Sequence, residues 1–461
     1  MHATQRPVRV FNRANSRRLG LTQSIAGPID ETLRNIPVEV RHWLLTLFLM
    51  PFVTILFWPA VYALYATILL VVYTKILRGR LRNMRSHWIL FGKWFYSILI
   101  ALFYAFSSFS STINIGCIMA CELYGYITLY NRRWRDEEIV AFSRAFIVVL
   151  ISIAVFGFIF STALAGAGLT LDPISGYGLT HRLLILTPPT KYGTYGHSVL
   201  LYAGFFIALI GISNLGVLGL RVRTFVTILA AIFVILAGTA TGILSLASLF
   251  VVLSIESLKL PRFFSVLSHI IFLSALVYIS ISPDGVTQFM EFVRVDVMRL
   301  QASVYGHDFT SGRALLNHVL WDAIQDSPWI GGGHDAPAVQ LGLAVVQGRT
   351  NSYQANSESS LIGGAAYGLP YLVFQCVVVA SPIIGIFSNN IKLRVACSGF
   401  IYGTLVFIVS NNMFGQGHVA EALLVLTFSM FLTAISVQSV FGARTSGQPP
   451  GVGLNREVLV R

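Results

Sequence analysis

Long apolar runs, each about the length of a bilayer-spanning helix, recur along most of this chain. A helix needs about 20 predominantly apolar residues to cross the hydrocarbon core of a membrane. Short polar or basic connections separate most of the runs. The pattern predicts an all-α, polytopic integral membrane protein with about twelve spanning helices. We expect these helices at 42–58, 60–77, 88–108, 112–130, 140–164, 198–220, 224–239, 241–258, 263–282, 359–386, 395–413 and 419–439.

Composition points to the same class of protein. Hydrophobic residues make up 55% of the 461 residues and charged residues only 11%. A soluble chain of this length could not bury so much apolar surface in one core. The first residues are polar and Arg-rich, with no short apolar stretch before a cleavage site. We therefore expect the first apolar run to be a spanning helix rather than a cleaved signal.

The net charge of +13 is explained by topology. With the N-terminus inside, most of the 32 Lys and Arg residues fall on the cytoplasmic side of the predicted spans, as the positive-inside rule requires. This distribution predicts a bacterial inner-membrane protein with both termini cytoplasmic, and it argues against nucleic-acid binding. The four cysteines lie inside predicted spans without the spacing of a zinc site, so we interpret them as small apolar residues.

The spans divide the chain into five parts. We expect a basic cytoplasmic tail at 1–41, nine spanning helices at 42–282, a periplasmic loop at 283–358, three further helices at 359–440, and a disordered cytoplasmic tail at 441–461. A connection as long as 283–358 is expected to carry structure or function of its own.

Two amphipathic helices are predicted within the long loop. In the first, apolar residues at 289, 293, 297 and 300 share one helical face. The second begins after a capping pair, Thr310 and Ser311, and ends before Pro328 and the glycines at 331–333. Its apolar face consists of Leu316, Val319, Leu320 and Ala323.

Arg313 is the best candidate for binding an anionic group. It lies in the first turn of the second predicted helix, where free backbone N–H groups already favour an anion. A guanidinium at that position can bind phosphate oxygens in a bidentate manner. The alternative is a surface Arg paired with an acidic neighbour, and this alternative is favoured for Arg182 and Arg294.

Glu358 and His334 are the candidate bases. Glu358 lies where the long loop re-enters the membrane, and partial desolvation there would raise its pKa. It could equally be a helix N-terminal carboxylate stabilised by the dipole. His334 follows three glycines that would let a ligand approach the backbone closely, although a lone His is more often only hydrogen-bonded. Further polar residues on the predicted outer face, which could contact a substrate, are Lys191, His197, Arg349 and Asn356.

Few ionisable groups fall inside the predicted spans. Glu122, Glu256 and Glu421 are the acidic ones, and only Glu122 is expected to lie deep in the membrane. A proton-coupled carrier usually needs more such groups. We find no internal repeat, which also argues against a transporter.

The order of these features resembles the O-antigen ligase and polysaccharide polymerase family of the bacterial envelope. The segment SGRALLNHVLWDAIQDSPWIGGG resembles that family's Gly-Arg, Trp and Pro-x-x-Gly-x-Gly run. The matching positions are Gly312, Arg313, Trp321, Pro328, Gly331 and Gly333. The re-entry segment SESSLIGGAAYGLPYLVF is similar to its His-Asn-x-x-Leu…Gly run at Leu361 and Gly368.

Two positions depart from the family pattern. A Ser-Arg-Gly site is replaced by Ala240-Thr241-Gly242, and the His-Asn pair by Ser357-Glu358. Because the ligase branch depends on that His, the resemblance favours a polymerase with Glu358 as the substituted base.

The resemblance implies a metal-independent glycosyltransferase without a cofactor. It would join polyprenyl-pyrophosphate-linked oligosaccharide units at the periplasmic face, in exopolysaccharide or O-antigen synthesis. Arg313, supported by Arg182 or Arg294, would bind the pyrophosphate, and Glu358 or His334 would act as the base. Candidate partners are a chain-length regulator and a flippase of the same pathway. A ligase that transfers glycan to another acceptor is the alternative within the family, and a lipid-linked sugar transporter or flippase is the alternative outside it.

Overall fold

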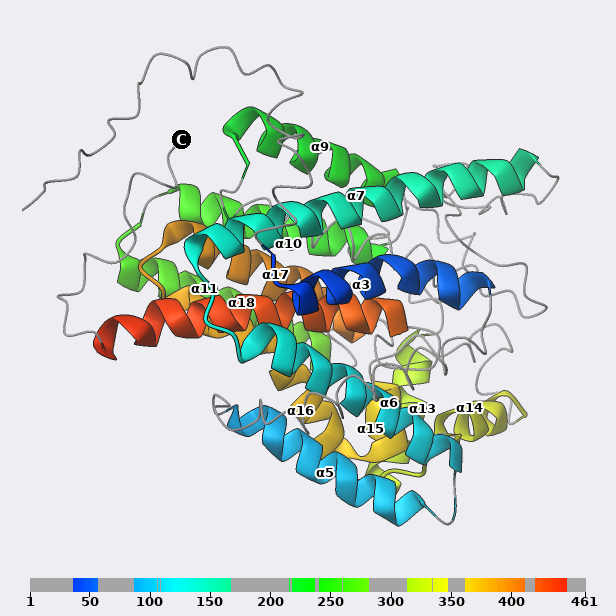
Figure 1. The fold of residues 1–461 in the computed structure, drawn as a ribbon. Coiled ribbons are helices and arrows are strands. Elements are labelled where there is room, and N and C mark those ends of the chain that lie inside the picture. The colour runs from blue at the N-terminus through cyan, green and yellow to red at the C-terminus, as the bar shows by residue number, and fades with distance from the viewer. Residues whose placement is uncertain are drawn as a thin grey trace, which may run out of the picture.

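The computed structural model of the chain describes residues 36–56, 87–105, 107, 109–166, 215, 218–236, 240–258, 260–281, 313–333, 335–346, 361–410 and 419–445. All regular elements within these residues are helices, with no strand among them, so the predicted all-α class is confirmed. Figure 1 shows the long helices lying side by side, with three short helices, α13, α14 and α15, gathered near one end of α5 and α6.

Most predicted spans within the described residues are helical. The predicted span 60–77 lies wholly outside the described residues, and 198–220 lies mostly outside them. The same holds for most of both predicted tails and for the first predicted amphipathic helix. The helices are α3 (Val38–Leu56), α5 (Trp88–Tyr104), α6 (Phe109–Gly125), α7 (Asp136–Gly166), α9 (Leu220–Leu236), α10 (Ala240–Ser257), α11 (Arg262–Ile281), α13 (Arg313–Asp326), α14 (Ala336–Val346), α15 (Leu361–Tyr367), α16 (Leu369–Ala380), α17 (Ile391–Ser410) and α18 (Val419–Thr445), together with a π-helical turn η2 (Tyr126–Tyr130) and a 3₁₀ helix η5 (Ser381–Phe387).

The predicted continuous helix at 359–386 is wrong. The described chain forms the short helix α15 and then, after Gly368, the longer segment α16–η5. Gly368 has a φ of +90°, a conformation that does not continue an α-helix and that residues with a side chain rarely adopt. The apolar run is long enough for one helix, but the backbone turns at this glycine.

One helical segment within the described residues, Leu369–Phe387, is both long and apolar enough to cross a membrane by itself. Shorter apolar helices occur at Trp88–Tyr104, Leu246–Ser257, Arg262–Ala275 and Val425–Phe441. This length and composition support association of the chain with a membrane.

Aromatic side chains from α3, α7, α17 and α18 form the centre of the main core. Phe142 of α7 packs against Phe431 of α18 with ring centroids 4.3 Å apart, and Phe400 of α17 meets Phe428 of α18 edge to face. Trp43 of α3 is buried and donates from Nε1 to the Thr427 hydroxyl at 2.7 Å. The indole is therefore both packed and hydrogen-bonded, as buried Trp requires.

Hydroxyl groups support the change from α16 to η5. Pro382 has no N–H, so the carbonyl of Val378, four residues earlier, loses its α-helical donor and accepts instead from the backbone N–H of Ser381. The Ser381 hydroxyl donates to that carbonyl at 2.8 Å, and Ser429 of α18 donates to it at 3.0 Å. Buried backbone carbonyls need such partners, above all in a membrane, so α18 stabilises the bend in its neighbour.

Side-chain hydrogen bonds from Gln438 and Glu138 stabilise the turn before α7. The Gln438 side chain accepts from the backbone N–H of Trp134 at 3.0 Å and donates to its carbonyl at 2.6 Å. Glu138 accepts from the backbone N–H of Arg135 at 3.1 Å and from Arg132 at 2.7 Å. Burial alone would raise the pKa of Glu138, but these hydrogen bonds and the charges of both arginines together lower it.

Candidate functional site

The segment Ser327–Gly333, which we call the glycine turn, joins α13 to the start of α14. It pairs with the end of α15 through backbone hydrogen bonds. Gly332 donates to the Ala365 carbonyl and Gly333 to the Ala366 carbonyl, both at 2.9 Å. The backbone N–H of Leu369 donates to the Pro328 carbonyl at 2.8 Å. The two segments that carry the family resemblance therefore lie against each other.

Two glycines permit this approach. A Cβ on Gly331, whose φ is +67°, would lie 2.4 Å from the carbonyl carbon and oxygen of Ala366. A Cβ on Gly368 would lie 2.4 Å from the Trp329 carbonyl oxygen. Any side chain at either position would push the two backbones apart. The glycines of the motif are thus required by packing, whatever else they do.

Two tyrosines of α5 donate to carbonyls of the glycine turn. The Tyr104 hydroxyl lies 2.7 Å from the Gly331 carbonyl oxygen and 3.3 Å from that of Ile330. The Tyr96 hydroxyl contacts the Trp329 carbonyl and lies 3.1 Å from the carbonyl of Tyr367. Carbonyls of the irregular backbone between α13 and α14 thereby receive hydrogen-bond donors from a neighbouring helix.

An apolar face anchors α13 on α15. Val319, Leu320, Ala323 and Ile324 are buried together with residues of α15. The apolar face that the sequence predicts is confirmed for Val319, Leu320 and Ala323. The predicted helix itself is also confirmed, since α13 begins at Arg313 and ends at Asp326.

Arg313 is the one predicted site residue that falls within the described residues, as the first residue of α13; its side chain is outside them. The described glycine turn ends at Gly333, directly before His334, and α15 begins three residues after Glu358. The segments next to both candidate bases are therefore brought to the same end of the bundle. The other predicted site residues lie outside the described residues: Arg182, Lys191, His197, Arg294, His334, Arg349, Asn356 and Glu358.

A buried ion pair lies between α5 and α6. The Lys93 ammonium contacts Glu122 Oε1, and both side chains have no exposed surface. The Trp94 indole donates to Glu122 Oε2 at 3.2 Å. The predicted deep carboxylate thus has a cation beside it from the neighbouring helix. The Lys93 ammonium also lies 5.1 Å from the centre of the Tyr371 ring on α16.

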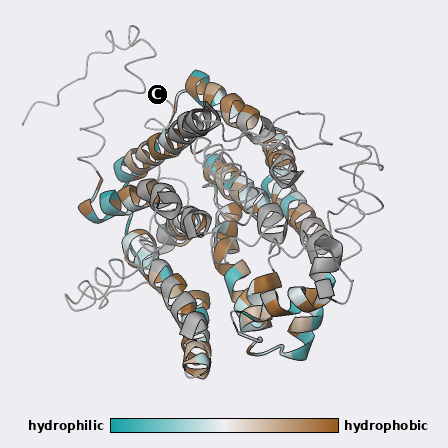
Figure 2. Ribbon diagram, turned by 90° about the vertical axis from the view of Figure 1, so that its right-hand side faces the viewer, coloured by the Kyte–Doolittle hydropathy of each residue, from teal (hydrophilic) through white to brown (hydrophobic). Residues whose placement is uncertain are grey.

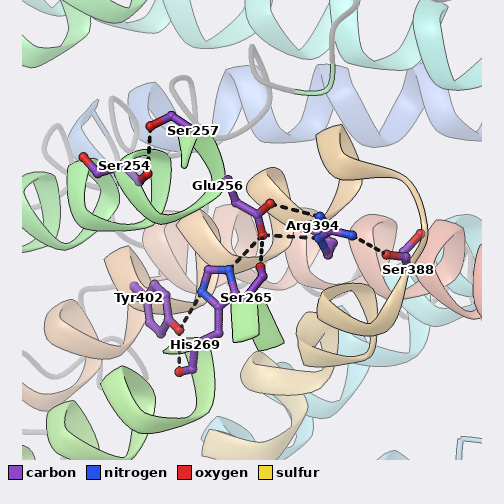
Figure 3. A network of polar contacts seen from close by, with 8 residues as sticks. All are labelled: Ser254, Glu256, Ser257, Ser265, His269, Ser388, Arg394 and Tyr402. Carbon is purple, nitrogen blue, oxygen red and sulfur yellow. Dashed lines mark hydrogen bonds and ion pairs between the residues drawn. The ribbon is translucent and has the colours of Figure 1, made fainter. Parts of the chain in front are cut away.

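A second polar network joins α10, α11 and α17 (Figure 3). Glu256 of α10 accepts two hydrogen bonds from the guanidinium of Arg394, at 3.2 and 3.1 Å, one on each carboxylate oxygen. It also accepts from the Ser265 hydroxyl at 3.0 Å and from His269 Nε2 at 2.9 Å. Arg394, one of the basic residues on the predicted cytoplasmic side, is therefore buried in an ion pair, with only 6% of its surface exposed.

His269 has a hydrogen-bond partner at each ring nitrogen. The Tyr402 hydroxyl donates its single proton to the His269 carbonyl at 2.6 Å, and its oxygen lies 3.0 Å from His269 Nδ1. His269 Nε2 lies 2.9 Å from Glu256 Oε1, so the imidazole connects the Tyr402 hydroxyl to the Glu256 carboxylate. Glu256 therefore lies between the Arg394 guanidinium and the His269 imidazole.

The sequence alone identifies neither network as a unit. Lys93 and Glu122 are separated by 29 residues, and Glu256 and Arg394 by 138. The available signal is each ionisable residue's position within or beside an apolar run, since such groups usually have partners. The sequence does not say which partner each one has.

No group of three or more His, Cys, Asp or Glu side chains that could hold a metal ion occurs among the described residues. In comparisons with known proteins, no family model matches the chain, and no curated protein matches it.

Proposed function

We propose that this protein is a polymerase of the bacterial inner membrane that joins polyprenyl-pyrophosphate-linked oligosaccharide units. The observation that carries the proposal is the pairing of the glycine turn with the end of α15. The two segments that resemble the O-antigen ligase and polymerase family form one structural unit through Gly332 and Gly333.

Exposed apolar side chains support a multi-pass arrangement. Large hydrophobic residues are exposed along α5, α9 and α11, and examples are Phe95, Leu102, Phe225, Ile228, Phe263 and Ile271. Figure 2 shows hydrophobic residues on helices at the outside of the bundle as well as within it. Contiguous exposed apolar faces are unusual for a soluble monomer, whereas lipid would cover them. An arrangement with about twelve spans, as the sequence predicts, is compatible with these exposed faces.

The proposed reaction is a direct glycosyl transfer. A hydroxyl oxygen of the acceptor unit attacks the anomeric carbon of the donor, and the bond from that carbon to the pyrophosphate oxygen breaks. The acceptor proton passes to Glu358 or His334, and the electron pair of the broken bond leaves with the pyrophosphate. Arg313 at the first turn of α13, with Arg182 or Arg294, binds the diphosphate and stabilises its developing charge.

The glycine turn gives this proposal its structural basis. Backbone pairing and the apolar face of α13 fix the C-terminal end of that helix against α15. Arg313 begins the same helix, while His334 and Glu358 belong to the chain directly beyond the fixed segments. The proposal thus assigns the anion-binding residue and the base to chain segments that continue from this support, and catalysis requires such groups to be positioned together.

The test is incubation of the purified, full-length protein in lipid nanodiscs with polyprenyl-pyrophosphate-linked repeat units. We expect a ladder of products that differ by one repeat unit. Arg313→Ala and Glu358→Gln should each shorten or abolish the ladder, while Arg221→Gln, at an exposed position of α9, should leave it unchanged. The proposal is wrong if the wild-type protein forms no ladder. The site assignment alone is wrong if both variants match the wild type.

A further inference from the structure

The Lys93–Glu122 ion pair leaves hydrogen-bonding capacity unused. An ammonium has three donors, and Glu122 Oε1 is the hydrogen-bond acceptor of Lys93 found within the described residues. The other carboxylate oxygen accepts from Trp94 at 3.2 Å. The face of the Tyr371 ring attracts the ammonium but does not replace a hydrogen-bond acceptor.

Two neighbouring side chains of α16 also carry polar atoms whose hydrogen bonds are unmade among the described residues. The hydroxyl of Tyr371 and both terminal atoms of the Gln375 carboxamide are buried and have no hydrogen-bond partner among the described residues. Each residue is only 1% exposed. The two lie four positions apart, so they share one face of α16, and the Tyr371 ring on that face meets Lys93.

Leaving these atoms unpaired would be costly. A buried polar group without a partner costs about 1–3 kcal/mol, and a charged group costs more. Tyr371 and Gln375 contribute three such atoms on one face of α16, and the Tyr371 ring on that face lies against the partly unsatisfied Lys93 ammonium, so a dry site is unfavourable. Buried waters in proteins occupy this kind of setting and each make about three hydrogen bonds to otherwise unpaired polar groups.

We propose that α5, α6 and α16 enclose a bound-water site formed by Lys93, Tyr371 and Gln375. Water accepts from the Lys93 ammonium and the Tyr371 hydroxyl and exchanges hydrogen bonds with the Gln375 carboxamide. The Lys93 ammonium is fully buried and has three N–H donors, of which Glu122 accepts one. Bound water supplies acceptors for the other donors. This site goes beyond the proposed glycosyl transfer and does not depend on it.

Radiolytic hydroxyl labelling of the full-length protein in nanodiscs tests the site, because radicals formed from bound water modify the side chains next to it. Tyr402 is a matched control, since it is equally buried but its hydroxyl donates to the His269 carbonyl. We expect Tyr371 to be modified several-fold faster than Tyr402. Equal, slow labelling of both tyrosines would overturn the proposal.

Two variants give an independent measurement. If water is bound, Tyr371→Phe and Gln375→Leu each remove hydrogen bonds, so the midpoint of thermal unfolding should fall. If the site is dry, each variant removes an unpaired polar group, so the midpoint should stay the same or rise. A fall in both variants supports the water site, and an unchanged or higher midpoint in both contradicts it. Neither measurement involves the product ladder, so failure of this inference is distinct from failure of the proposed function.

Discussion

Gly331 and Ala366 lie so close that a Cβ on the glycine would be 2.4 Å from the alanine carbonyl oxygen. A neighbouring hydrogen bond strengthens this contact, because Gly333 donates to the Ala366 carbonyl at 2.9 Å. Two segments that α14 separates in the sequence therefore share one backbone interface. The glycine turn and the end of α15 should respond to mutation as a single unit.

Gly331→Ala should destabilise the protein. The alanine would have to adopt a left-handed conformation, which costs about 1–2 kcal/mol, and its Cβ would also displace Ala366. The matched control is Gly342→Ala on α14, where a Cβ would have no other atom within 4 Å. That change should be neutral or stabilising by up to about 1 kcal/mol, because Ala favours a helix. Thermal unfolding in detergent would compare them, and equal midpoints would contradict the close contact.

The Tyr104 hydroxyl should contribute to stability through the glycine turn. Tyr104→Phe removes the donor to the Gly331 carbonyl and should cost about 0.5–1.5 kcal/mol. In a Gly331→Ala background the carbonyl is already displaced, so the same change should cost less. A double-mutant cycle measures this coupling. Strictly additive effects would mean that the two residues do not act on the same structure.

Removal of Arg394 should be among the most damaging single changes. Arg394→Met leaves the Glu256 carboxylate, whose side chain is 4% exposed, without its guanidinium partner. Breaking one side of a buried pair typically costs about 3–5 kcal/mol. Arg221→Met, at an exposed position, serves as the control in thermal unfolding. The double variant Glu256→Gln with Arg394→Met should recover part of the loss, and a single-variant effect no larger than the control would contradict the pairing.

Glu138 should make stability depend on pH. Its pKa is lowered in the folded protein from an ordinary value of 4.5, so its contribution is complete above that value. The contribution is lost as pH falls from about 4.5 through the lower folded pKa. The difference in unfolding midpoint between wild type and Glu138→Gln should therefore be largest near neutral pH and shrink in acid. Glu137→Gln, in the same first turn of α7 but exposed, should show a smaller change. A difference independent of pH would contradict the Arg132 contact.

The sequence predicts the elements better than their interactions. Apolar periodicity and a capping pair locate α13 and its buried face, because both signals are local. The break at Gly368 is not predicted, because its cause, the approach of the Trp329 carbonyl, comes from a distant segment. For the same reason the sequence indicates that Glu122 is a deep carboxylate but does not identify its partner Lys93. Local patterns predict helices, whereas pairings between helices depend on their three-dimensional arrangement.

In the candidate site, too, the sequence identifies individual residues, whereas the structure shows their contacts. In the sequence, the glycines at 331 and 368 resemble positions of a family pattern, and the structure adds that each one fits a specific backbone contact. The chemical roles proposed for Arg313, His334 and Glu358 remain predictions. They rest on the sequence pattern and on the family resemblance, and measurements of activity test them.

The role of the glycine turn in the proposed polymerase is tested by product ladders from the wild type, Gly331→Ala and Gly342→Ala proteins in the same nanodiscs. We expect a ladder for the wild type and for Gly342→Ala, and a strongly shortened or absent ladder for Gly331→Ala, assayed at a temperature where it remains folded. A Gly331→Ala ladder equal to that of the wild type would contradict a working role for the glycine turn. The absence of any ladder from the wild type would contradict the polymerase itself.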